Sequence, residues 1–416
     1  MGENEKRKIY FIRKKILTIV LMAMLFAYVG FNIYTNREAF LYELNDAVDD
    51  FTDGHHTPTE VIADLEKSLT RQALGRMDFV EVASYANVIL DKRESENFEY
   101  IKDEDGSLQY ASFFMESPEQ EFDYAMRILR LKEFAEAYGT DVLVVIAPQK
   151  YIPSMDRLRS GMPAYDPSEE VNEFMFYLNR LGIDTLDLGA RIPNDEVSYE
   201  DAFFKTDHHW TVDAAFSATE MLVDTLNDNY GYDLDAETYL SRDMYTQLMY
   251  HQGMLGSMGR GTGACFSGLD DFNMYVPNFE MNFYRKTIED DQYVESEGDM
   301  VGTLILPHYL YREEGIYKDS QYSVYLDGIH NYDQIINLDN PDGLKVFMVR
   351  DSYFSPVVTF MAPMCGEIDT IWSVEDTDLV DIEEYIRNNR FDCIILEYYP
   401  HNMKDEAFDY FMEAGE

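Results

Sequence analysis

Residues 141–148 read DVLVVIAP, an apolar run rich in β-branched side chains that is typical of a strand buried on both faces of a parallel sheet. Strand-like and helix-like segments alternate around it along the chain. The predicted elements are a helix over 168–181, a strand GIDTLDL (182–188), a helix from near Thr211, a strand LKVFMV (344–349), a helix from about Phe354, a strand EIDTIWSV (367–374), a helix over 378–389 and a strand FDCIILEYY (391–399). This alternation predicts an α/β fold with a doubly wound parallel sheet that helices cover on both faces.

Weaker signals surround this pattern. The alternating segment 98–114 turns at Asp105-Gly106 and predicts a hairpin, and Ser117-Pro118 predicts the start of a helix. Apolar residues at helical spacing predict a helix over 58–91. Residues 230–340 are rich in Tyr, Gly and Asp, with short strand-like runs, and we expect them to form an insertion on the core domain.

The N-terminal segment has the pattern of a membrane anchor. Residues 1–15 are basic, and residues 16–34 form an apolar stretch of about the length that crosses a hydrocarbon core as a helix. No small-x-small cleavage site follows, so we expect an uncleaved signal-anchor. Basic flanks remain in the cytoplasm, which places the rest of the chain outside. We therefore expect a stalk over 35–57 and the α/β domain over 58–416.

The composition excludes several classes of function. The net charge of −46 disfavours nucleic acid and anionic lipid surfaces, because both are polyanions. Only three cysteines occur, without a CxxC spacing, so neither a disulfide framework nor a zinc knuckle is indicated. The 32 tyrosines mildly favour contact with carbohydrate.

Two short clusters carry the candidate chemistry. FKTDHHWT (204–211) precedes a predicted helix, and VRDSY (349–353) follows a predicted strand, so both lie where open α/β sheets form ligand sites. A serine hydroxyl becomes a nucleophile when a histidine accepts its proton and an acid orients that histidine. Asp207 and His209 supply the acid and the base, and Ser352 supplies a hydroxyl at the start of a helix. A helix-capping role is the alternative for Ser352.

The motif TDHHWT resembles the signature of the DHHW proteins of Gram-positive bacteria. These are similar to the alginate O-acetylation proteins of the SGNH hydrolase superfamily. The resemblance covers roughly 98–215 and 340–403, including APQK (147–150) and LEYYPHN (396–402). It implies Asp207 as the orienting acid, His209 as the general base and Ser352 as the nucleophile, with Asp-x-His upstream of the serine as in a circular permutation. Arg350 is a departure, because the superfamily has glycine there; the Ser352 N–H remains the candidate oxyanion donor.

Several other residues are candidates for substrate contact: Arg350, Tyr353, Trp210 and Arg260. The structural alternative for Trp210 is packing beneath the turn that holds His209. Arg260 lies in GMLGSMGRGTG (253–263), which lacks the terminal Gly-Lys-Ser/Thr of a phosphate loop and is expected to be a flexible loop. His208 is expected to pack without a metal, and Glu397 and His401 end the last strand in either a structural or an active-site role.

The leading functional hypothesis is O-acyl transfer, in particular acetylation of a cell-envelope polysaccharide through an acyl-serine. The family resemblance implies a membrane-bound O-acyltransferase as the source of the acyl group. No cofactor and no metal are expected. Two alternatives remain open: a carbohydrate esterase or deacetylase that uses the same triad, and a non-catalytic envelope scaffold or glycan-binding protein.

Overall fold

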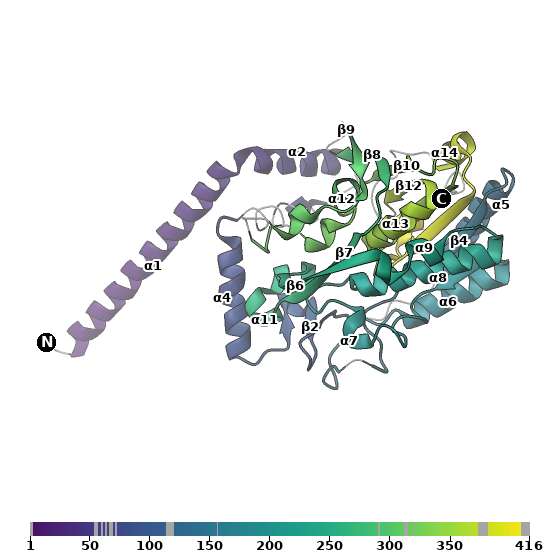
Figure 1. Ribbon diagram of the computed structural model, residues 1–416. Coiled ribbons are helices and arrows are strands. Elements are labelled where there is room, and N and C mark those ends of the chain that lie inside the picture. The colour runs from purple at the N-terminus through teal and green to yellow at the C-terminus, as the bar shows by residue number, and fades with distance from the viewer. Residues whose placement is uncertain are drawn as a thin grey trace. The chain divides into compact units, whose positions relative to one another are not determined.

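The computed structural model describes residues 3–408, apart from 54–56, 60, 63–64, 66–69, 71–72, 114–119, 156, 290–291, 312–314, 319 and 373–381. The chain forms two compact units, Met1–Val82 and Ala83–Glu416. Figure 1 labels many of the helices and strands of both.

The first unit is helical. Helix α1 covers Glu3–Thr35 and α2 covers Arg37–Asp53, so the segment predicted as a stalk is helical over most of its length. Within α1, Arg7–Thr35 is long and apolar enough to cross a membrane, with a mean hydropathy of 2.2. Helix α4 (Arg76–Ile89), which runs from the first unit into the second, covers the later part of the helix predicted over 58–91, and a turn at Leu74 and Gly75 precedes it. The predicted helix start at Ser117-Pro118 lies outside the described residues, and α5 begins at Glu121.

A mixed eight-stranded sheet forms the centre of the second unit, in the order β5-β4-β13-β11-β12-β10-β8-β9. Five neighbouring strands are parallel: β5 (Asp184–Asp187), β4 (Asp141–Ile146), β13 (Cys393–Tyr398), β11 (Leu344–Arg350) and β12 (Cys365–Trp372). The remaining three pair antiparallel: β10 (Tyr332–Asn337), β8 (Asn282–Glu289) and β9 (Gln292–Asp299). The predicted α/β fold class is confirmed, with an antiparallel extension at one edge.

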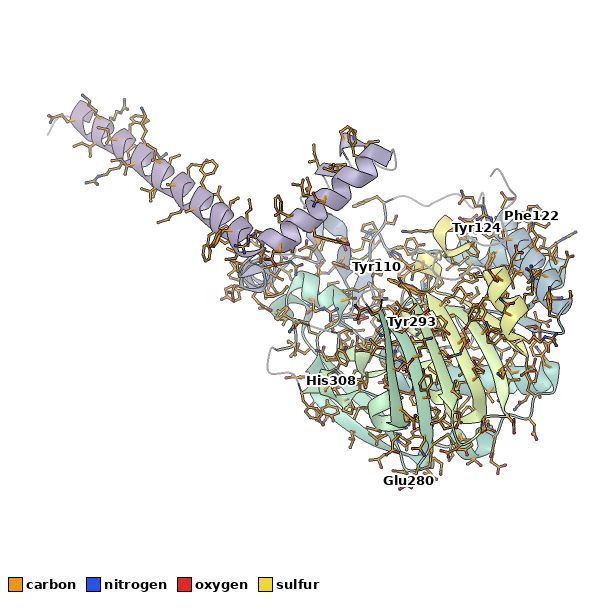
Figure 2. The ribbon with its side chains drawn as sticks, turned by 90° about the horizontal axis from the view of Figure 1, so that it is seen from above. Tyr110, Phe122, Tyr124, Glu280, Tyr293 and His308 are labelled. Carbon is orange, nitrogen blue, oxygen red and sulfur yellow. The ribbon has the colours of Figure 1, made fainter. Side chains whose placement is uncertain are left out.

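Helices cover both faces of the sheet. Alternate residues of β4 enter two separate apolar clusters, Leu143 and Val145 on one face and Val142, Val144 and Ile146 on the other, as the pleat of a doubly covered strand requires. The first cluster includes residues of α8 (Val212–Tyr230) and α13 (Ser355–Met361). The second includes residues of α5 (Glu121–Glu136), α6 (Ser168–Leu181) and α14 (Ile382–Asn389). Figure 2 shows the side chains that fill the space around the strands.

The segment 230–340, predicted as an insertion, contributes to the main sheet. It supplies β8, β9 and β10, which extend the parallel strands. Strands β8 and β9 are separated by only residues 290–291, and so short a link joins antiparallel neighbours and not parallel ones. The segment also forms a two-stranded ribbon of β6 (Tyr245–Met254) and β7 (Asp270–Pro277).

Short elements complete the unit. The hairpin predicted at Asp105-Gly106 is present as β2 (Tyr100–Lys102) and β3 (Leu108–Tyr110), with β1 (Glu94–Ser95) beside β2. The short α-helices are α7 (Tyr199–Ala202), α9 (Ala236–Tyr239), α10 (Ser257–Thr262), α11 (Ala264–Ser267) and α12 (Met300–Thr303). The 3-10 helices are η1 (Glu96–Phe98), η2 (Arg242–Met244), η3 (Pro307–Leu310), η4 (Gln321–Val324), η5 (Ser352–Phe354), η6 (Ala362–Met364), η8 (Pro400–Asn402) and η9 (Asp405–Phe408).

Candidate active site

The fold brings the two candidate clusters together at the carboxyl edge of the sheet. Ser352 follows the end of β11 and begins η5. Asp207 and His209 lie in the loop between α7 and α8, where the Thr211 hydroxyl caps α8 by accepting a hydrogen bond from the N–H of Ala214. The cap ends the loop at a fixed point, two residues after His209, and so limits where the imidazole can lie.

Asp207, His209 and Ser352 form a continuous hydrogen-bonded chain. The Nε2 atom of His209 lies 2.8 Å from the Oγ of Ser352, and Nδ1 lies 2.5 Å from Oδ1 of Asp207. Because an ionised carboxylate only accepts hydrogen bonds, Nδ1 carries the proton and Nε2 is left to accept the serine proton. Asp207 and His209 are buried, whereas Ser352 is half-buried and reaches solvent. This arrangement has the geometry of a nucleophile, a base and an orienting acid.

The Asp207 carboxylate is held in its ionised form. Burial opposes ionisation, yet the adjacent imidazole groups of His209 and His208 and the hydrogen bonds from His209 lower the pKa of Asp207 well below its ordinary value. Its Oδ1 accepts from the His209 N–H at 3.0 Å, and its Oδ2 accepts from the Ser257 N–H at 2.6 Å. An ionised, fully hydrogen-bonded Asp207 stabilises an imidazolium at His209.

The glycine-rich segment 253–263 supports the Asp207 loop. It was predicted to be a flexible loop, and this prediction is wrong, because Ser257–Thr262 forms α10 against the loop. The N–H of Gly256 donates to the Thr206 hydroxyl at 2.8 Å, and that of Gly259 donates to the Thr206 carbonyl at 2.8 Å. A Cβ on Gly256 would lie 2.5 Å from that carbonyl and would clash with Asp207. The glycines therefore serve close packing between two backbones.

We expect Gly256→Ala to impair the site, because the added methyl group must displace Asp207 or Thr206. Overpacking of this kind costs about 1–3 kcal/mol of stability. Displacement of the acid should also lower the turnover of an acetyl ester. The matched control is Gly261→Ala in the same helix, where the new Cβ would meet Tyr100 at an ordinary 3.4 Å. Thermal unfolding and turnover of both variants test this account, and equal effects of the two substitutions would contradict it.

Two further residues hold the loop, and the sequence did not single them out. Lys150 is buried, and its Nζ donates to the carbonyls of Lys205 and Asp207 at 3.0 and 2.9 Å. Asp270 accepts from the N–H groups of Lys205 and Thr206 at 2.7 and 2.8 Å. The stretch APQK (147–150) could have pointed to Lys150, because a lysine soon after a buried strand lies at the carboxyl edge of the sheet. Asp270 comes from a distant ribbon, so no local pattern marks it.

Trp210 packs beneath the site. Its side chain is fully buried, and Nε1 donates to the Tyr322 hydroxyl and the Tyr353 carbonyl, each at 3.0 Å. The ring of Tyr322 stacks on His209 with centroids 4.1 Å apart. The Tyr353 hydroxyl donates to the carbonyl of His208. These aromatic groups fix the position of the imidazole and leave Trp210 no surface for a substrate.

The other candidates for substrate contact have different surroundings. Arg350 is fully buried, with Nη2 3.4 Å from Asp333, and Nη1 donates to the Asp351 carbonyl and the Ser355 hydroxyl at 3.1 Å. This position explains how an arginine replaces the glycine of the superfamily, because its side chain points into the core and braces the loop. Arg260 is half-buried, and its Nη1 donates to the Leu255 carbonyl at 3.5 Å.

Two buried acids, Asp351 and Glu397, support the loop that holds Ser352. Asp351 accepts from the Tyr353 N–H at 2.8 Å and from Nδ2 of Asn402 at 3.0 Å, and its own N–H donates to Glu397 at 2.8 Å. Burial and the neighbouring Asp351 raise the pKa of Glu397 well above its ordinary value. Glu397 therefore has a structural contact with the nucleophile loop. The Asp351 side chain, and not Ser352, caps η5.

His208 extends the polar cluster. Its Nδ1 lies 2.9 Å from the Ser257 hydroxyl and 3.4 Å from Asp207. Asp207, His208 and His209 offer ligand atoms within 4.8 Å of one another and could together hold a metal ion. A metal there would compete with the hydrogen bonds that join Asp207 to His209 and His209 to Ser352.

We expect His208 to make stability depend on pH. Burial and the neighbouring imidazole of His209 lower the pKa of His208 to about 3, against about 6.5 in the unfolded chain. Between these values the unfolded state binds the extra proton, so the contribution of His208 is present above pH 6.5 and is lost as the pH falls toward 3. Compared with the His208→Asn variant, the free energy of unfolding of the wild-type protein should fall by about 1.4 kcal/mol for each pH unit below 6.5. Denaturant unfolding of both proteins at pH 7.5 and at pH 4.5 measures the difference between their free energies of unfolding. If that difference were the same at both pH values, the lowered pKa of His208 would be contradicted.

Comparisons with known proteins agree with this architecture. Residues 105–261 match the family model described as the SGNH hydrolase-like domain of acetyltransferase AlgX. Similar solved structures include PatB1 of Bacillus cereus with a sulfonyl adduct, at 16% identity and a TM-score of 0.59 over 75% of this chain and 97% of that one. A DHHW family protein from Eubacterium siraeum has 16% identity and a TM-score of 0.53 over 76% of this chain and 96% of that one. No curated protein matches the chain in sequence.

At these identities the solved structures establish the fold and not the reaction. The family model adds, over residues 105–261, a match to the SGNH hydrolase-like domain of an acetyltransferase, and the resemblance predicted from TDHHWT is confirmed. The chain therefore contains an SGNH hydrolase-like domain and shares its fold with a DHHW family protein.

Proposed function

We propose that this protein is a membrane-anchored O-acetyltransferase that modifies a cell-envelope polysaccharide through an acyl-Ser352 intermediate. The observation that carries the proposal is the 2.8 Å contact between Nε2 of His209 and Oγ of Ser352, with Asp207 bonded to the opposite nitrogen. The SGNH hydrolase-like domain of the acetyltransferase type supports acyl transfer as the reaction class.

The reaction has two halves. In the first, Oγ of Ser352 attacks the carbonyl carbon of the acetyl donor while His209 takes the serine proton. The tetrahedral intermediate then expels the donor oxygen, which receives that proton from His209, and acetyl-Ser352 remains. In the second, His209 removes the proton of a sugar hydroxyl, whose oxygen attacks the acetyl-serine, and Ser352 recovers its proton. The Ser352 N–H is the proposed donor to the oxyanion in both halves.

We propose that this chemistry takes place outside the cell. Basic residues precede the apolar part of α1, which favours a cytoplasmic N-terminus and an extracytoplasmic domain. Acetyl-CoA is absent there, so the acetyl group must be delivered across the membrane. We propose a membrane-bound O-acyltransferase as the donor, which fits a domain tethered at the membrane surface.

Protease added outside protoplasts should digest the domain and leave a small N-terminal fragment in the membrane. The physical reason is that only α1 would be shielded by lipid, whereas residues 36–416 would face the medium. Immunoblots against N-terminal and C-terminal tags measure the result. A C-terminal tag that survives in intact protoplasts and disappears only after lysis would overturn the assignment.

Transfer and hydrolysis can be separated with one substrate. Water is far more concentrated than sugar hydroxyls, so transfer requires that the enzyme position an acceptor beside the acyl-serine, which can be worth several kcal/mol. The full-length protein in detergent is given a chromogenic acetyl ester with and without envelope oligosaccharides. A transferase should release chromophore slowly alone and form acetylated sugar when an acceptor is added. Fast acetate release, unaffected by any acceptor and joined by deacetylation of acetylated glycan, would favour an esterase.

A further inference from the structure

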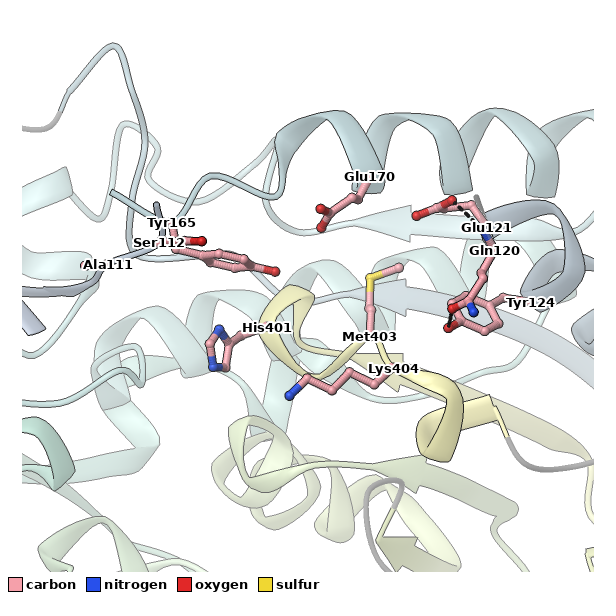
Figure 3. Close-up of a pocket in the computed structure, with 10 residues that line it drawn as sticks. All are labelled: Ala111, Ser112, Gln120, Glu121, Tyr124, Tyr165, Glu170, His401, Met403 and Lys404. Atoms are coloured by element: carbon pink, nitrogen blue, oxygen red, sulfur yellow. Dashed lines mark hydrogen bonds between the residues drawn. The ribbon is translucent and has the colours of Figure 1, made fainter. Parts of the chain in front are cut away.

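A pocket of about 220 Å³ borders the candidate active site at η8. Figure 3 shows its lining, with Glu170 on one side and Lys404 on the other. This volume lies below the roughly 300–1,000 Å³ of pockets for drug-sized ligands, which suits a single sugar ring and not a whole chain. Its walls combine the aromatic ring of Tyr165 with charged and amide groups. The apolar face of a sugar ring could therefore pack on the tyrosine, and the sugar hydroxyls could form hydrogen bonds with the polar groups.

Ring contacts connect this pocket to the triad. His401 lines the pocket and stacks on Tyr110 with centroids 4.3 Å apart and planes 6° apart. Tyr110 lies 6.2 Å from the His208 ring, which in turn lies 3.9 Å from the His209 ring. The next residue after His401, Asn402, donates to Asp351 at 3.0 Å, directly before Ser352. The pocket and the triad are thus connected through η8 and a series of ring contacts.

The charges of the lining disfavour an acidic ligand. Two carboxyl groups, Glu121 and Glu170, share the pocket with one ammonium group, Lys404. The whole chain carries a net charge of −46, which adds a repulsive field for any polyanion. The Gln120 amide and the Glu170 carboxylate, which also line the pocket, supply hydrogen-bond donors and acceptors. Donors and acceptors of this kind suit sugar hydroxyls.

We propose that this pocket is the acceptor subsite and that it binds one ring of a saccharide without acidic groups, in preference to a uronate. The role of this ligand as acyl acceptor rests on the proposed function. The binding of a neutral saccharide and the preference over a uronate do not depend on that function. Tyr165 supplies the apolar platform, and Glu170 supplies the charge that rejects a uronate carboxylate.

The test measures binding to the full-length Ser352→Ala protein in detergent, so that no turnover interferes. The probes are trimers of glucose, galactose and N-acetylglucosamine, and a β-1,4-linked glucuronate trimer that differs from cellotriose only in oxidation at C6. We expect at least one neutral trimer to bind about tenfold more tightly than the glucuronate trimer. Tyr165→Ala should weaken that binding by about tenfold, and Tyr165→Phe should retain it, which separates ring contact from misfolding.

Two variants that each replace a glutamate of α6 by lysine form a matched pair. Glu170→Lys should raise the affinity for the glucuronate trimer, whereas Glu169→Lys, an exposed neighbour on α6 that does not line the pocket, should not. Equal binding of the glucuronate and neutral trimers, no binding of any neutral trimer at millimolar concentration, or equal effects of the two lysine variants would overturn the proposal. Retained binding in a protein whose Ser352 proves unreactive would instead remove the proposed function and leave the pocket assignment standing.

Discussion

Replacing Ser352 with alanine should lower the kcat for acetyl-ester turnover by about 10⁴–10⁶-fold, the range expected when a triad nucleophile is removed. The fold should persist, because the structural cap of η5 is Asp351 and the Ser352 hydroxyl bonds to His209. Circular dichroism and thermal unfolding should therefore match the wild-type protein. Turnover of a chromogenic acetyl ester measures the loss.

Ser160→Ala is the control for this substitution, since Ser160 is exposed and distant in sequence from both clusters. It should leave turnover unchanged. If Ser352→Ala retained wild-type turnover, the nucleophile assignment would be wrong. The scaffold hypothesis would then be the stronger one if the wild-type protein also failed to react with a serine-directed fluorophosphonate.

Asp207→Asn should lower kcat by about 10⁴-fold, because an amide can donate a hydrogen bond to Nδ1 and so favour the tautomer in which Nε2 carries the proton. In that tautomer Nε2 cannot accept the proton of Ser352. The Ser257 N–H would still find an acceptor if the amide oxygen replaces Oδ2, whereas the His209 N–H would lose the Oδ1 acceptor, so we expect a loss of about 1–3 kcal/mol of stability and a protein that remains folded. Steady-state kinetics with the acetyl ester measures the effect.

The chain offers a second aspartate–histidine pair as a control. Asp271 lies 3.0 Å from Nδ1 of His251 in an exposed position. Asp271→Asn makes the same chemical change in the same kind of pair, and it should leave turnover unchanged. A loss at Asp271 as large as that at Asp207 would show that the effect is general and not tied to the tautomer of His209.

The sequence was sufficient to predict the three members of the candidate triad because they follow a simple rule. Each lies in a loop between a strand or short helix and a longer helix, and such loops meet at the carboxyl edge of a parallel sheet. The boundaries of α6 and the cap at Thr211 were also predictable, since helical periodicity and capping chemistry are local.

The supports of the site were not predictable in the same way. Glycines in 253–263 suggest flexibility when they are considered alone, and only the approach of the Thr206 backbone shows that they permit close packing. Arg350 likewise resembled a binding residue, because an arginine at a strand end is usually exposed. Its burial depends on Asp333, which comes from β10, a strand that joins the sheet through long-range antiparallel pairing.

The pocket beside the site was beyond local reasoning for a related reason. Its wall combines residues from α5, α6 and the segment after β13, which are separated by more than 200 positions between Glu170 and His401. No periodicity links such segments. The parallel order β4-β13 in the sheet brings them together, and that order is a property of the whole fold.

The most direct test of the account is whether an acetyl group becomes covalently attached to Ser352. The full-length protein is mixed with an acetyl ester, quenched in acid and digested, and the peptides are analysed by mass spectrometry. The account predicts one acetyl group on the peptide that contains Ser352, lost on addition of a sugar acceptor and absent from Ser352→Ala. Turnover of the ester with no acetyl group on that peptide, or with the acetyl group on another residue, would contradict it.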